Sequence, residues 1–90
     1  MKTQTEKETR DAYISCIKNY LTGRRYYENK DYAKAKVHFD ITVKTFSDIA
    51  EFMLTRVELC CAISISEKAE IGSLVCARKM YVIDESAKLL

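Results

Sequence analysis

The chain has 90 residues, enough for one small domain, and carries a formal net charge of only +2. It has no proline, two glycines and 48% hydrophobic residues, so it favours long helices over a β-sandwich, which needs a turn signal roughly every 8–12 residues. The aromatic content of 10% argues against disorder. No apolar run approaches the roughly 20 residues of a membrane span, and the first residues lack an apolar leader.

The first predicted helix covers residues 5–29. Thr5 and Glu8 have the T-x-x-E spacing of a capping box, in which two side chains bond to the free amides of the first turn. Apolar residues then recur at helical spacing, which predicts one buried face. This face contains Tyr13, Ile17, Tyr20, Leu21 and Tyr27.

The second predicted helix covers residues 31–46 and follows a polar turn at residues 28–31. Asp31 suits its N-terminus because a carboxylate oxygen accepts a free backbone amide there. Ser47 and Asp48 predict the next break. The apolar face of this helix contains Tyr32, Ala35, Phe39, Val43 and Phe46.

Two further helices are predicted over residues 48–65 and 67–89. The β-branched segment 62–66 is interpreted as a last helical turn and a loop, since a lone short strand has no partner. Gly72 is unfavourable inside a helix unless a neighbour packs closely against it. The fourth helix carries Ile71, Leu74, Val75, Arg78, Tyr81, Val82 and Leu89. The expected fold is a single all-α domain, 1–90, of four antiparallel helices.

The cysteines and the single histidine do not form a pattern typical of catalysis or metal binding. Cys60 and Cys61 are adjacent and therefore point in different directions on a helix, which is unsuitable for a shared ion. Cys16 and Cys76 are isolated. We expect four free, buried thiols in a reducing cytoplasm, with no metal and no cofactor. His38 is expected to face solvent, so the chain is predicted not to be an enzyme.

Residues 23–39 resemble a tetratricopeptide repeat (TPR). Gly23 and Tyr26 give its G-x₂-Y spacing, Ala35 and Phe39 give A-x₃-F, and Tyr32 supplies an aromatic residue at the turn. The resemblance implies two helix-turn-helix pairs, with Gly23 and Ala35 at the closest approach of the first pair. It also implies a protein-interaction module of the adaptor, scaffold or chaperone type.

The resemblance places the binding surface on the first helix of each pair. The expected partner-binding residues are Tyr20, Arg24, Tyr27, Thr55 and Glu58. The positions that hold a carboxylate clamp in many members of the family are here Tyr20, Arg24 and Thr55, so that clamp is not expected. The expected partner is a protein or peptide. Because two repeats bury few apolar residues, a second copy or a larger parent chain is expected to cover the last helix.

Two other interpretations remain open. The segment Tyr32–Ala35 also resembles the Tyr-x₂-Ala turn of microtubule-interacting-and-trafficking (MIT) domains, three-helix bundles, which implies binding of helical motifs from membrane-remodelling proteins. Basic residues between 18 and 36 would suit nucleic acid, although the small net charge argues against it.

Overall fold

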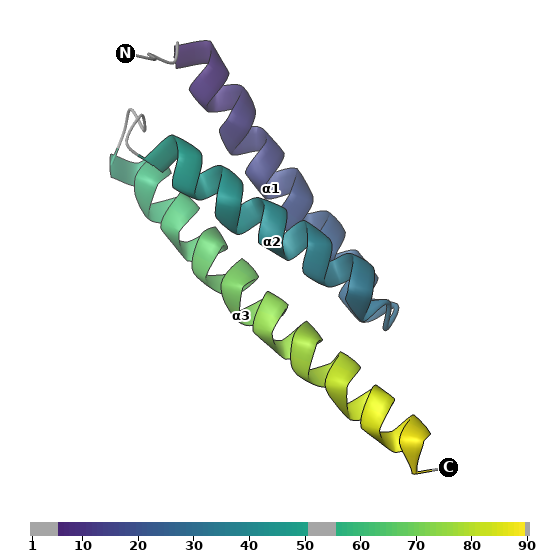
Figure 1. Ribbon diagram of the computed structural model, residues 1–90. Coiled ribbons are helices and arrows are strands. Elements are labelled where there is room, and N and C mark those ends of the chain that lie inside the picture. The colour runs from purple at the N-terminus through teal and green to yellow at the C-terminus, as the bar shows by residue number, and fades with distance from the viewer. Residues whose placement is uncertain (1–5, 51–55, 90) are drawn as a thin grey trace.

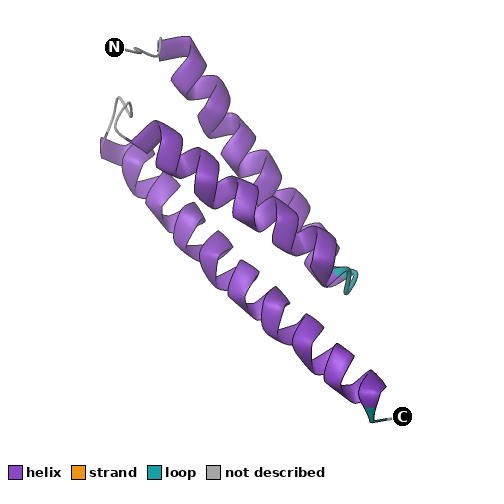
Figure 2. Cartoon of the chain, in the orientation of Figure 1, coloured by secondary structure: helices purple, strands orange, loops and turns teal. Residues whose placement is uncertain are grey.

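The computed structural model describes residues 6–50 and 56–89, with side chains from 7–50 and 59–89, and these segments form three helices (Figures 1 and 2). They are α1 (Glu6–Glu28), α2 (Tyr32–Ile49) and α3 (Arg56–Lys88). Helix α2 packs against both α1 and α3, whereas α1 and α3 contact each other little. The C-terminal part of α3 extends past the turn that joins α1 to α2 (Figure 1).

The prediction of four helices and two repeat-like pairs is wrong, because the structure has one helix pair followed by one long helix. Helix α2 continues through Ser47 and Asp48 to Ile49. Both polar residues lie on its exposed side, while Ile49 is buried. Continuing the helix therefore buries an isoleucine and leaves the polar side chains in solvent.

The predicted break at Ser66 is also wrong, because α3 runs through the whole β-branched segment. Ala62 and Ser66 are both buried there, one helical turn apart. Their small side chains allow α3 to pack closely, and this tertiary packing outweighs the weak local preference of the neighbouring isoleucines for a strand.

The predicted turn between the first two helices is confirmed. The Asp31 amide donates to the Tyr26 carbonyl at 2.9 Å and the Lys30 amide donates to the Tyr27 carbonyl at 3.0 Å, the pattern of a Schellman motif. Lys30 has the left-handed φ of 63° that this motif requires. Asp31 then caps α2 by accepting from the Lys34 amide, as its position predicted.

The buried residues of each helix lie three, four or seven positions apart, the spacing of helices that pack nearly side by side. On α3 the buried residues are small, whereas Ile71 and Leu74 are 61% and 67% exposed. Leu21 of α1 is also exposed. The buried side chains with this spacing are Thr9, Cys16, Ala35, Phe39, Thr42, Ile49, Ala62, Ser66, Ala69, Ser73 and Cys76.

The ring of Phe39 lies between the only two glycines of the sequence. A methyl group on Gly23 would lie 2.8 Å from one edge of the ring, at Cδ1 and Cε1, and 3.3 Å from the Ala35 carbonyl oxygen. A methyl group on Gly72 would lie 2.8–2.9 Å from the opposite edge, at Cε2 and Cδ2. The predicted close approach of Gly23 and Ala35 is confirmed, and Phe39 extends the contact to α3.

Alanine at either glycine should destabilise the protein. Alanine favours a helix over glycine by about 1 kcal/mol, but the new methyl group would overpack a ring held on both sides, at a cost of about 1–3 kcal/mol. We expect Gly23→Ala and Gly72→Ala each to lower the free energy of unfolding, Gly23→Ala more because of the Ala35 carbonyl. The measurement is urea unfolding followed by circular dichroism.

Phe39→Leu supplies the control for these variants. In that background Gly72→Ala should cost far less than it does beside Phe39, because the smaller side chain leaves room for the methyl group. Equal effects of Gly72→Ala with and without Phe39 would contradict the close contact.

Lys30→Gly should stabilise the turn. A non-glycine residue in the left-handed conformation is strained by roughly 1–2 kcal/mol, and glycine removes this strain. Part of the resulting gain in stability is offset by the greater freedom of glycine in the unfolded chain. We expect a gain of about 0.5–1 kcal/mol in the free energy of unfolding. The matched control, Lys44→Gly on the exposed face of α2, should instead lose about 1 kcal/mol. A loss of stability in Lys30→Gly would contradict the strain.

Candidate functional site

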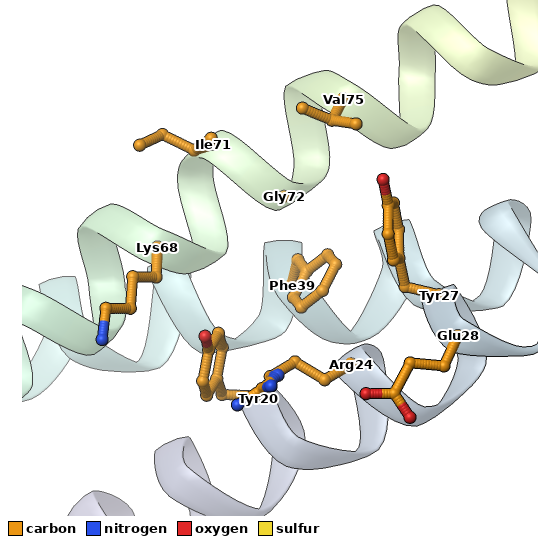
Figure 3. A pocket seen from close by; sticks show the side chains of 9 residues that line it. All are labelled: Tyr20, Arg24, Tyr27, Glu28, Phe39, Lys68, Ile71, Gly72 and Val75. Carbon is orange, nitrogen blue, oxygen red and sulfur yellow. The ribbon is translucent and has the colours of Figure 1, made fainter.

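A groove of about 380 Å³ runs between α1 and α3, with Phe39 of α2 at its floor (Figure 3). The two glycines pack against opposite edges of the Phe39 ring, which is itself only 4% exposed. The rings of Tyr20 and Tyr27 extend from α1 with their hydroxyl groups toward α3 (Figure 3). The groove is lined by Tyr20, Arg24, Tyr27, Glu28, Phe39, Lys68, Ile71, Gly72 and Val75.

Aromatic contacts hold the α1 wall of the groove in place. Tyr20 packs against Phe39 with ring centroids 6.0 Å apart, and the Arg24 guanidinium lies 5.9 Å from the centre of the Tyr20 ring. Tyr27 meets Tyr32 edge to face at 5.5 Å. Such pairs prefer these tilted geometries and restrict the rings, so the wall is largely preformed.

The rim of the groove is charged and its floor is apolar. Arg24 and Lys68 stand on opposite walls, and Glu28 is the one acidic residue of the lining. All three are exposed. The groove therefore combines an apolar floor with an excess of positive charge above it, an arrangement suited to an amphipathic segment with an acidic edge.

The structure brings together three of the five predicted binding residues. Tyr20, Arg24 and Tyr27 all line the groove. Thr55 and the Glu58 side chain lie outside the described residues. Whether these residues bind a partner stays a prediction.

The opposite wall, formed by Lys68, Ile71, Gly72 and Val75, was not predicted as part of the site. The assumed break at Ser66 placed these residues in a separate fourth helix that was not expected to line the binding surface. The signal that points to the groove is Gly72, because a glycine in a helix interior suggests close packing by a neighbour.

A second groove, of about 360 Å³, lies between α2 and α3. In it Ser73 donates a hydrogen bond to Asp40, and Lys36 donates to the same carboxylate at 2.8 Å. Partial burial raises the pKa of Asp40, but these two hydrogen bonds and the Lys36 charge outweigh it, so the net shift is downward. These three side chains therefore have a structural role, because the hydrogen bond from Ser73 to Asp40 links α3 to α2.

His38 lies in the α1–α2 contact, so the prediction that it faces solvent is wrong. Its Nδ1 is 3.1 Å from Oδ1 of Asn19, and its ring stacks on Tyr26 with centroids 5.5 Å apart. The side chain is half-buried. These contacts give His38 a structural role between two helices.

All four cysteines are free, but only two of them are buried as predicted. Burial raises the pKa of Cys16 to about 11. The pKa of Cys76 is also raised, chiefly by burial, with Asp40 adding to the shift and Lys36 and Lys79 opposing it. Cys60 and Cys61 are exposed.

No group of three or more histidine, cysteine or acidic side chains suitable for a metal ion occurs in the described segments. Across the same segments, none of the helices combines the length and the apolar character needed to cross a membrane. Comparisons of the chain with models of protein families, with curated proteins and with solved structures found no match.

The thiols should fall into two reactivity classes. Alkylation requires the thiolate, so at mildly alkaline pH Cys60 and Cys61 should react with iodoacetamide, while Cys16 and Cys76 should react only after unfolding. Peptide mass spectrometry of the folded and urea-unfolded protein distinguishes the four sites. Rapid alkylation of Cys16 in the folded protein would contradict its burial.

Proposed function

We propose that this chain is a non-catalytic protein-interaction module, of the adaptor, scaffold or chaperone type, that holds a partner helix or peptide in the groove between α1 and α3. The observation that carries the proposal is the groove itself, whose walls carry Tyr20, Tyr27 and Ile71 above a floor formed by the buried Phe39 ring. Tyrosine and arginine are enriched at protein interfaces because they combine large contact areas with hydrogen bonding.

The groove favours a partner with two kinds of side chain on one face. Apolar side chains would contact Ile71 and the rings of Tyr20 and Tyr27, and an acidic side chain would lie near Arg24 or Lys68. An amphipathic helix presents such a face through residues three and four positions apart.

A second candidate is an MIT-like module that binds helical motifs of membrane-remodelling proteins. The helix count favours it, since residues 6–50 and 56–89 form three helices, the number in that family. Nucleic acid is a weaker candidate because Lys34 and Lys36 are paired with Asp31 and Asp40 on their own helix or its cap.

A displayed library of helical peptides selected on the wild-type protein tests the groove. We expect the selected peptides to combine apolar and acidic residues. Their affinity should fall by roughly tenfold or more, about 1.4 kcal/mol, for Arg24→Glu, because the substitution reverses the charge on the rim. Adding Tyr27→Ala should weaken binding further. Titration calorimetry measures both effects.

Arg25→Glu is the matched control. Arg25 is exposed beside Arg24 but does not line the groove, so this variant should bind the peptides as the wild type does. Equal losses in Arg24→Glu and Arg25→Glu would indicate a general charge effect and contradict the groove. Unchanged binding in the Arg24→Glu, Tyr27→Ala double variant would also contradict it.

A further inference from the structure

The outer face of α3 carries large apolar residues and has no covering element within the described chain. Ile63, Ile71, Leu74 and Val82 are between 39% and 67% exposed. Helical periodicity places this stripe roughly 150° around the helix from the buried residues of α3. Several exposed large apolar residues aligned on one face of a helix indicate a candidate interaction surface on a small protein.

The same stripe contains one acidic and one basic residue, Glu67 and Arg78. Both are exposed. Neither forms an ion pair or hydrogen bond within the residues that the structure describes. Each is therefore available for a partner of opposite charge.

The stripe is complementary in charge and apolar character to a second copy of itself that runs in the opposite direction. Glu67 and Arg78 lie at equal distances from the midpoint between Gly72 and Ser73. Ile71 and Leu74 are also equidistant from that midpoint, and so are Ile63 and Val82. In an antiparallel pair of α3 helices centred there, Glu67 faces Arg78, Ile71 faces Leu74, and Ile63 faces Val82.

We propose that a second copy of this chain covers the face, with the two α3 helices antiparallel about a two-fold axis near Gly72 and Ser73. A two-fold axis repeats every contact, so two Glu67–Arg78 ion pairs would flank the apolar centre. A parallel pair in register would instead place Glu67 against Glu67 and Arg78 against Arg78, which like-charge repulsion disfavours. The paired segment, from Ile63 to Val82, is about 30 Å long at 1.5 Å per residue.

This surface is centred on a different side of α3 from the groove proposed as the partner-binding site, and the two share only Ile71. Glu67, Leu74 and Arg78 do not line the groove, whereas Tyr27 does. Substitutions at the first three residues therefore test the pairing of copies without altering the groove walls.

Sedimentation equilibrium of the full chain over a range of concentrations tests the proposal. The wild type should dimerise, and Leu74→Asp should be monomeric because it places two carboxylates at the apolar centre. Glu67→Arg and Arg78→Glu should each raise the dimer dissociation constant by roughly tenfold or more. The double variant should restore the wild-type value, because the ion pairs form again with reversed charges.

Asp11→Arg is the matched control for Glu67→Arg, since it makes the same charge change on the exposed side of α1, which contacts α3 little, and should leave dimerisation unchanged. Circular dichroism confirms that the variants keep their helices, which is expected because the substituted side chains are exposed.

Three results would overturn the proposal. A wild type that stays monomeric at the highest concentration would show that a second copy does not cover this face. A dimer that survives Leu74→Asp but is lost in Tyr27→Ala would place the second copy in the groove. Loss of the dimer in both single charge variants without recovery in the double variant would exclude the antiparallel register.

Discussion

The contact of the Phe39 ring with Gly23 and Gly72 fixes the arrangement of the three helices. One edge of the ring meets α1 and the opposite edge meets α3, so a single side chain of the central helix determines how closely both neighbours approach it. The backbone near Gly23 also comes close to the Ala35 carbonyl. Since α1 and α3 contact each other little, the space above the ring stays open as a groove.

The distribution of small and large side chains on α3 follows from this close packing. Ala62, Ala69 and Cys76 are buried, whereas Ile71 and Leu74 are largely exposed. A helix that packs through small residues brings its backbone near its neighbour and turns its larger apolar residues outward. The result is a long helix that borders the groove on one side and presents an apolar stripe on another.

The two surfaces have different physical characters, which suits them to different occupants. The groove is concave, with aromatic side chains and mostly positive charge at its rim, and fits an acidic amphipathic segment. The stripe on α3 is convex and carries both charges in a symmetric order, so it matches a reversed copy of itself. A dimer paired through the stripe would contain two such grooves, each sharing Ile71 with the contact between the copies.

Local sequence determined the helical class, the turn at residues 28–31, the Asp31 cap and the close approach of Gly23 and Ala35. Helix caps, turns and the contact between two helices joined by a short turn all depend on residues that are near in the sequence. It also placed Tyr20, Arg24 and Tyr27 on one face of the first helix. Only the tertiary structure decided that Ser47 and Ser66 lie within helices and that Gly72 forms the other wall of the groove. A polar residue ends a helix or remains inside it according to what packs on its neighbours, and that packing comes from residues distant in the sequence.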